Sequence, residues 1–204
     1  MEQTQERTAT SGMKQTTFDE FIELTRRGTF VPVYKEVMAD LFTPVSAFLK
    51  VAEHADYAFL LESVEGGEHV ARYSFLGKDP FLVLKTENGQ TVIEQSGETK
   101  PIEEPFVDAL RRLISEYRSP FVPDLPRLTG GAVGYFGYDA SPWFEPALAD
   151  AWTADTNRKK APLDASGQPI EPDGEAAFML FDTVLAFDHV KHRILIIANA
   201  RITP

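Results

Sequence analysis

Two periods of apolar residues run along this chain, and they predict its helices and strands. Thr17 and Glu20 form a Thr-x-x-Glu capping box ahead of apolar residues at helical spacing, which predicts a first helix. Thr43-Pro44 supplies an N-cap and a proline at the first helical position, so a second helix should run from there to about His54. A third helix is predicted over residues 103–118, with acidic residues in its first turn.

Short apolar runs rich in β-branched and aromatic residues predict strands between and after these helices. Asn88-Gly89 separates two such runs and is a strong hairpin signal, because both central residues of a type I′ turn need a positive φ. The last two runs flank residues 190–192 and predict a terminal hairpin. Strands are expected over residues 30–35, 57–64, 70–76, 81–86, 91–94, 177–189 and 193–200.

The order of these elements predicts the fold class. Strand meanders with interspersed helices do not follow the regular alternation of α/β proteins, so we predict an α+β fold of antiparallel β-sheets with helices packed outside. Residues 1–16 are polar and predict a flexible N-terminal arm, followed by one domain over residues 17–204. Within that domain, residues 150–175 follow neither apolar period and predict a long exposed insertion.

Composition excludes several classes of protein. The 204 residues are 43% hydrophobic, which suffices for a packed core. The net charge of −11 argues against a nucleic-acid partner, because such binding depends on clustered Lys and Arg. The chain contains no cysteine, which excludes disulfides and cysteine metal sites, and no apolar run approaches the roughly 18 residues of a membrane span. We therefore expect a cytoplasmic protein that contacts neither membrane nor nucleic acid.

Two candidate chemical sites are disfavoured by their context. The glycines of residues 130–137 are typical of a phosphate loop, but the stretch lacks a Gly-Lys-Ser/Thr ending. Glycines that alternate with Val, Tyr and Phe favour a crowded strand, in which missing side chains let a neighbour pack closely. His189 and His192 lie in a predicted turn and favour a solvated pair over a metal site. We predict no catalytic and no metal-binding residue in this chain.

The predicted strand over residues 57–64 is interrupted by a carboxylate and a hydroxyl, at Glu62 and Ser63. An ionised side chain in an apolar strand is costly unless a partner satisfies it. From the residues alone two interpretations are open. Glu62 lies at the solvent-exposed end of the strand, before the turn of residues 65–68, or it meets a polar group inside a ligand site.

Four stretches of the sequence carry a resemblance to a known family. They are residues 28–34, residues 39–45 (ADLFTPV), residues 59–64 together with residues 71–77 (ARYSFLG), and residues 130–139 (GGAVGYFGYD). In this order and spacing they resemble the start of component I of anthranilate synthase, the chorismate-using enzyme of tryptophan biosynthesis. The resemblance runs from about Phe18 to the last residue.

The resemblance implies that this region carries much of the feedback pocket for L-tryptophan. By motif, Ser63 is expected to contact the ligand, with Glu62 beside it and Leu61 as an apolar wall. A free amino acid needs an acceptor, donors and an apolar slot, and this motif offers all but a cationic group. Weaker candidates on an antiparallel neighbour are Arg72, Tyr73 and Ser74. Arg72 is equally expected as a sheet-stabilising partner of Glu62.

The resemblance also implies a carboxy-terminal part that handles chorismate and magnesium and completes a two-sheet β-sandwich. The chain stops soon after the apolar run 193–198, whose edge would be unpaired, so we expect a fragment that lacks this chorismate-binding domain. Such a fragment should be inactive alone and bind tryptophan weakly or not at all. The complete enzyme is expected to bind Mg²⁺ and a glutamine amidotransferase subunit (component II), and to convert chorismate, with ammonia or glutamine, to anthranilate and pyruvate.

Two other interpretations compete with this one. The first is the equivalent region of aminodeoxychorismate synthase component I, from the folate pathway, although the agreement across residues 28–77 favours anthranilate synthase. The second is a stand-alone amino-acid-sensing module without enzymatic activity. A reading frame that continues beyond Pro204 into a chorismate-binding region would exclude the second.

Overall fold

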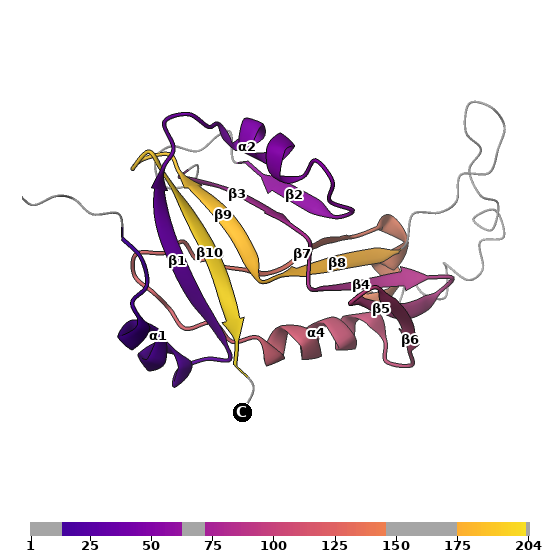
Figure 1. Ribbon diagram of the computed structural model, residues 1–204. Helices are drawn as coiled ribbons and strands as arrows, with labels where there is room; N and C mark the ends of the chain where they lie inside the picture. The colour runs from indigo at the N-terminus through magenta and orange to yellow at the C-terminus, as the bar shows by residue number, and fades with distance from the viewer. Residues whose placement is uncertain (1–13, 63–71, 146–174, 203–204) are drawn as a thin grey trace, which may run out of the picture.

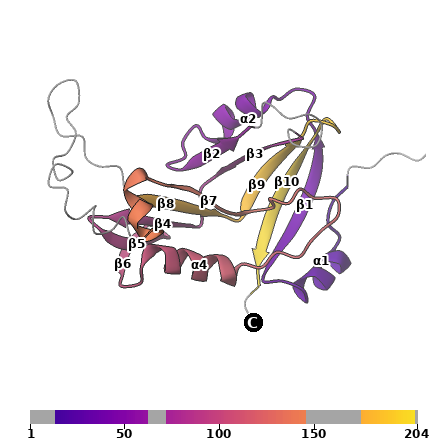
Figure 2. The same cartoon turned by 180° about the vertical axis from the view of Figure 1, so that it is seen from behind.

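The computed structural model describes residues 14–62, 72–145 and 175–202, and Figures 1 and 2 show it from opposite sides. Two five-stranded sheets form its frame, and all the strand pairs within them are antiparallel. The helices lie outside the sheets (Figure 1). The predicted α+β class with antiparallel sheets is therefore confirmed.

The first sheet, called sheet A, has β1 and β2 at its edges. Across the sheet its strands are β1 (Phe30–Met38), β10 (Arg193–Arg201), β9 (Thr183–Asp188), β3 (Tyr73–Lys78) and β2 (Ala58–Leu61). One face packs into a core cluster with Leu125 and Phe181. The other face is covered near β3 by α2 (Pro44–Val51), whose Ala47 and Phe48 pack with Leu76.

The second sheet, called sheet B, contains the remaining strands. In order they are β6 (Glu98–Ile102), β5 (Gln90–Gln95), β4 (Leu82–Glu87), β8 (Ala176–Phe181) and β7 (Gly131–Phe136). Helix α4 (Phe106–Glu116) lies along this sheet and buries Phe106, Leu110 and Leu113 against it. A 3₁₀ helix, η1 (Tyr138–Trp143), follows β7.

The prediction of a single strand over residues 177–189 is wrong, because this segment forms two strands. It is divided at Asp182, so that β8 belongs to sheet B and β9 to sheet A. The backbone oxygen of Asp182 accepts from Asn199, at 2.7 Å from the backbone N and 3.0 Å from Nδ2. The four strands predicted over residues 57–94 are divided between the sheets in the same way. Strands β2 and β3 lie in sheet A, whereas β4 and β5 lie in sheet B. The sheets are thus joined by continuous segments of chain.

The predicted hairpins are confirmed. Asn88 and Gly89 have φ of 52° and 75°, as a type I′ turn requires, and β9 and β10 form the terminal hairpin. Strand β6 was not predicted, since its residues are mostly exposed and show no apolar alternation. It follows a turn at Ser96-Gly97, where φ is again positive at both residues.

The glycine-rich stretch forms strand β7, as predicted, and pairs with β8. Gly134 shows why a glycine is needed there. A Cβ on Gly134 would collide with the backbone oxygen of Ala177 and would lie 2.6 Å from Cα of Phe178. The strand interpretation of these glycines is therefore confirmed.

Helix α1 (Phe18–Thr25) begins with the predicted capping box. The backbone N of Thr17 donates to Oε2 of Glu20 at 2.8 Å, and the backbone N of Glu20 donates to Oγ1 of Thr17 at 3.3 Å. None of the eight residues of α1, all within the described part of the chain, is buried. In the described residues no helix is both long and apolar enough to cross a membrane.

Residues 14–16, the end of the predicted arm, lie against the edge of sheet A. Thr16 donates its backbone N–H to the oxygen of Tyr34 at 3.0 Å and accepts from the backbone N of Tyr34 through Oγ1 at 2.9 Å. The rest of the predicted arm, and residues 150–174 of the predicted insertion, lie outside the described residues.

Candidate ligand-binding site

The residues predicted to bind a ligand that the structure describes lie at one end of sheet A. Leu61 ends β2 and is 45% exposed, and Glu62 follows it on the surface. Ser63 lies outside the described residues. Because β2 and β3 are antiparallel, with Leu61 opposite Phe75, Arg72 lies at this same end. The ends of β9 and β1 and the start of β10 also lie here, and we call this region the polar end of sheet A.

Arg72 bonds Asp188 rather than Glu62. Its Nε donates to Oδ1 of Asp188 at 3.1 Å and its Nη2 donates to Oδ2 at 2.9 Å. The side chain of Asp188 is fully buried, whereas that of Arg72 is about one-third exposed. The predicted pairing of Arg72 with Glu62 is therefore wrong, because strand pairing places the end of β9 next to the start of β3.

Asp188 accepts from three elements of the fold. Besides Arg72, the backbone N of Lys191 donates to its Oδ1 at 3.2 Å and Nε of Arg193 donates to its Oδ2 at 3.3 Å. Burial by itself would raise the pKa of this carboxyl. The hydrogen bonds from Arg72 and Lys191, with the charges of Arg72 and Arg193, outweigh burial and hold the pKa of Asp188 below its usual value.

Arg193 extends this network to the edge strand. Its Nη1 also bonds Oε1 of Glu36 on β1, so one guanidinium joins carboxylates from two strands. Its third nitrogen, Nη2, is buried and has no hydrogen-bond partner in the described residues. A buried donor without an acceptor costs free energy.

Tyr73 and Ser74 point to opposite faces of β3. Oγ of Ser74 is 2.8 Å from Nε2 of His189, and Ser74 is only 2% exposed. The guanidinium of Arg72 lies over the ring of Tyr73 at 4.9 Å from its centroid, and burial raises the pKa of the Tyr73 hydroxyl. Both side chains thus contact neighbouring residues of the same region of sheet A.

A pocket of about 400 Å³ opens at the polar end of sheet A. One wall comes from the segment before α2, with Asp40, Phe42 and Thr43, and the other from the β9–β10 hairpin. The hairpin contributes Phe187, Asp188, His189, His192 and Arg193. Apolar rings, carboxylates and cationic donors therefore line one pocket, and this mixture suits a small molecule that carries both charges and an apolar group.

The sequence predicted only part of this site. Leu61 and Glu62 do not line it, whereas Asp188 and Arg193, which do, were not predicted as site residues. The sequence signal that could have identified these two residues is a charge at each end of the hairpin turn, directly beside the apolar residues of the two strands. His189 and His192 both line the pocket, and among the described residues no group of His, Asp or Glu has the arrangement of a metal site.

Sequence comparison identifies relatives for most of the chain. It is 40% identical over 187 residues to anthranilate synthase component 1 of Acetivibrio thermocellus, covering 91% of this chain and 34% of that protein. It is also 40% identical over 184 residues to the component of the same name from Synechocystis sp., covering 90% and 33%. The Acinetobacter calcoaceticus component is 36% identical over 195 residues, covering 92% and 36%.

This chain is a homologue of anthranilate synthase component 1. The resemblance inferred from its motifs is thereby confirmed. The chain spans about a third of the length of these curated relatives. No family model matches it. A solved structure of anthranilate synthase component I from Streptococcus pneumoniae TIGR4 shares 24% sequence identity, with a TM-score of 0.46, covering 81% of this chain and 31% of that one.

Two of the four motif stretches flank the polar end of sheet A. Residues 39–45 form the wall before α2, and residues 72–77 lead into and form most of β3. Residues 130–139 lie elsewhere, in β7 and the start of η1. The residues shared with the family motifs therefore gather in part around the candidate site.

Proposed function

We propose that this chain is the amino-terminal, regulatory part of an anthranilate synthase component 1 and that it carries part of a feedback site for L-tryptophan. The complete protein would convert chorismate, with ammonia or glutamine, to anthranilate and pyruvate. The observation that carries the proposal is the 40% identity over 91% of this chain. All the relatives described above are anthranilate synthase components, which favours this pathway over the folate pathway.

The chemistry of the polar end of sheet A supports a site for a free amino acid. An amino acid presents an ammonium and a carboxylate on one carbon, and an indole adds an apolar plate with one N–H. Asp40 is an acceptor for an ammonium, and Phe42 and Phe187 are apolar. We propose that Ser63, Glu62 and Leu61 are the ligand-contacting motif; of these, Leu61 and Glu62 lie at the same end of sheet A as this pocket.

In this proposal the site acts by shifting a conformational equilibrium. A ligand shifts such an equilibrium only by its differential affinity for two states. The hydrogen bonds of Asp188 join β3, β9 and β10, and α2 packs on β3, so an occupant of the pocket would alter the relation of α2 to sheet A. The Mg²⁺ and the glutamine amidotransferase subunit of the complete enzyme belong to the same proposal.

A chimera tests the proposal directly. This chain would replace the matching region of the Acetivibrio thermocellus relative, and anthranilate fluorescence would be followed with chorismate, Mg²⁺ and ammonia. We expect anthranilate formation that L-tryptophan inhibits. A Ser63→Ala variant should have normal activity but roughly tenfold weaker inhibition, a loss of about 1.4 kcal/mol, which is within the range that one hydrogen bond contributes.

The other outcomes are informative. A folded chimera without anthranilate formation would contradict the proposed enzyme. Activity that L-tryptophan does not inhibit would contradict the proposed feedback site while leaving the enzyme intact. The matched control is Ser115→Ala, since Ser115 lies on the exposed face of α4 and bonds only the backbone of its own helix at Arg112.

A further inference from the structure

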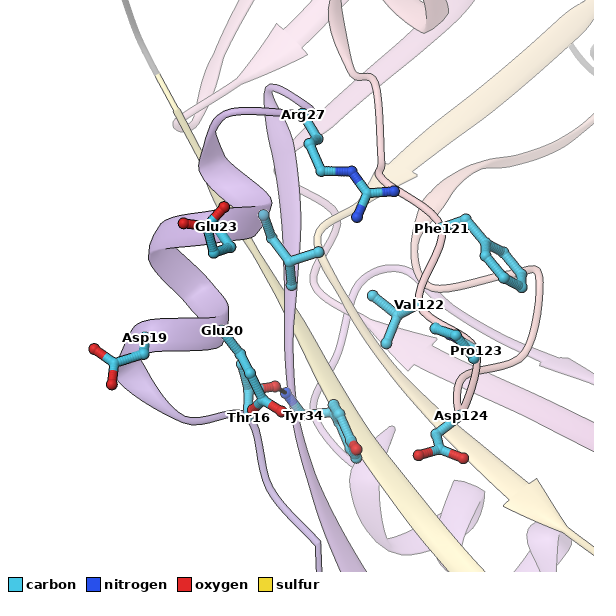
Figure 3. A pocket seen from close by; sticks show the side chains of 11 residues that line it. Thr16, Asp19, Glu20, Glu23, Arg27, Tyr34, Phe121, Val122, Pro123 and Asp124 are labelled. Atoms are coloured by element: carbon cyan, nitrogen blue, oxygen red, sulfur yellow. Dashed lines mark hydrogen bonds between the residues drawn. The ribbon is translucent and has the colours of Figure 1, made fainter.

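The two edge strands of sheet A are stabilised in different ways. At one edge residues 14–16 pair with β1, and a pocket of about 490 Å³ separates α1 from residues 121–124, with Tyr34 between them (Figure 3). At the other edge, within the described residues, β2 pairs with β3 alone. The position of this short strand, which leads into the proposed ligand-contacting residues Leu61 and Glu62, therefore depends on its side-chain contacts.

Tyr57, directly before β2, joins this strand to sheet B. Its hydroxyl donates to Oε2 of Glu94 on β5 at 3.2 Å. Lys85 of β4 binds the same carboxylate, because its Nζ lies 3.2 Å from that oxygen and 2.8 Å from Oε1 of Glu87. Burial raises the pKa of the Tyr57 hydroxyl, so it remains a proton donor at neutral pH. The hydrogen bond thus connects the start of β2 to two strands of the other sheet.

Phe59 makes a second contact between the sheets. Its ring packs edge-on against Phe181, the last residue of β8, with 4.8 Å between ring centroids and an interplanar angle of 66°. Gly77 lies opposite Phe59 on β3, and a Cβ on this glycine would lie 2.6 Å from Cε1 of the ring. The missing side chain at Gly77 therefore provides the space in which the Phe59 ring contacts sheet B.

Adjacent residues of β2 pack into different core clusters. Leu60 packs on the cluster that contains Ala47 of α2, whereas Phe59 packs on the cluster that contains Phe181. Successive side chains of a strand point to opposite faces, so β2 lies between α2 and the core that the two sheets share. The segment before α2 is a wall of the pocket at the polar end. A shift of β2 relative to sheet B would therefore move the ligand-contacting residues and also the neighbours of this wall.

Tyr57 is near enough along the chain to set the position of Leu61. Four residues separate them, which is about 13 Å at roughly 3.3 Å per residue, and neither glycine nor proline interrupts the strand between them. The backbone oxygen of Tyr57 accepts from the backbone N of Asp79 at 3.1 Å, which fixes the register of β2 with β3. Register does not fix the approach of β2 to sheet B, and the hydrogen bond to Glu94 supplies that constraint.

We propose that Tyr57 is a positioning residue for the feedback site and that, through Glu94, it keeps β2 against sheet B so that Leu61 and Glu62 are placed to contact the ligand. This inference rests on the feedback function proposed above and extends it to a residue outside the pocket and outside the ligand-contacting motif. Tyr57 acts through β2 and does not contact the ligand. Loss of its hydrogen bond lowers the affinity for L-tryptophan and leaves the catalytic reaction unchanged.

The test uses the chimera described above and two matched variants. Tyr57→Phe removes the hydroxyl that bonds Glu94, whereas Tyr34→Phe removes a hydroxyl at the opposite edge of sheet A that makes no hydrogen bond among the described residues. Tyr57→Phe should raise the L-tryptophan concentration for half inhibition roughly two- to fivefold, as the loss of one hydrogen bond implies. The uninhibited kcat and the KM for chorismate should not change. Tyr34→Phe should leave all three quantities unchanged.

Variants of Glu94 identify the bond itself as the cause. Glu94→Ala should weaken inhibition as Tyr57→Phe does, and the double variant should be no weaker than either, because both changes remove the same hydrogen bond. Glu94→Gln retains an acceptor oxygen for the Tyr57 hydroxyl and should preserve most of the inhibition. Additive losses in the double variant would mean that the two residues act separately and would contradict the proposal.

Three further results would overturn the proposal. They are unchanged inhibition in Tyr57→Phe, an equal loss in Tyr34→Phe, and a parallel fall in uninhibited activity, which would indicate general structural damage. A parent chimera that L-tryptophan does not inhibit would instead contradict the proposed feedback function. The positioning role is then decided on the ¹⁵N-labelled 204-residue chain. The amide resonances of Leu61 and Glu62 should shift in Tyr57→Phe and not in Tyr34→Phe, and unchanged resonances in both variants would exclude the role.

Discussion

Arg72 and Asp188 are 116 residues apart in the sequence and form a two-point ion pair at the polar end of sheet A, with donor–acceptor distances of 3.1 and 2.9 Å. The pair joins the residue directly before β3 to the last residue of β9. It also explains how a fully buried carboxylate is accommodated beside an apolar core, because such a charge is tolerated only when it is paired and hydrogen-bonded.

Arg72→Ala should destabilise the protein by about 1–3 kcal/mol at pH 7, because it removes two charged hydrogen bonds from a buried carboxylate. The lower half of this range is expected, since the Arg72 side chain is one-third exposed and Arg193 still bonds Asp188. Urea unfolding measures the change. Arg111→Ala is the control, because the Arg111–Asp108 pair is exposed and its loss should cost less than about 0.5 kcal/mol.

The effect of Arg72→Ala should depend on pH. The pKa of Asp188 is lower in the folded protein than in the unfolded chain, so its stabilisation is present above the unfolded-state pKa of about 3.9 and is lost as the pH falls through the folded value. The difference between the variant and the parent should therefore be fully present at pH 7 and shrink as the pH falls below the unfolded-state pKa and through the lower folded one. A difference that is constant with pH would exclude this charge as the cause.

Removing the N-cap side chains of α1 and α2 should change the stability of the protein to different extents. Thr43→Ala should lower the free energy of unfolding by about 1 kcal/mol, because α2 packs Ala47 and Phe48 into the core and its loss is felt globally. Thr17→Ala should mainly increase hydrogen exchange within α1, whose residues are not buried. Urea unfolding and amide exchange distinguish the two effects, and equal global destabilisation by both variants would contradict this account.

Gly134→Ala should destabilise the protein by about 1–3 kcal/mol, since the added methyl group collides with the backbone of β8 at Ala177 and Phe178. Thermal unfolding measures the change. Gly97→Ala is the comparison, because that glycine has open space around it but a φ of 79°, and its replacement should cost about 1 kcal/mol or less. The steric argument fails if Gly134→Ala is the milder of the two.

L-Tryptophan should bind this chain weakly, with a dissociation constant in the millimolar range or above, if the remaining two thirds of the homologous enzyme contribute to the pocket. Isothermal titration at high protein concentration measures it, with Ser63→Ala beside the parent chain. Heat that is lost in the variant would place Ser63 at the ligand. Tight stoichiometric binding by the parent would instead mean that this chain forms the whole pocket.

Local signals were sufficient for much of the secondary structure. The capping residues Thr17 and Thr43 begin α1 and α2, and Asn88-Gly89 forms the turn between β4 and β5. These signals are reliable because each is decided within four or five residues, by a hydrogen bond to the nearest turn or by the sign of φ. The family resemblance was likewise readable from four short stretches and is confirmed by the relatives.

The sequence by itself determined the class of fold, the N-caps of α1 and α2, the hairpin turns and the resemblance to anthranilate synthase component 1. Only the tertiary structure decided that the apolar run around Asp182 divides between sheet A and sheet B. An alternating pattern of apolar residues predicts which side chains share one face of a strand, but it does not predict which sheet the strand joins. It also decided that Arg72 pairs with Asp188, since that choice depends on β3 lying beside β9. Long-range neighbours of this kind follow from the packing of the whole chain, and no local period of the sequence encodes them.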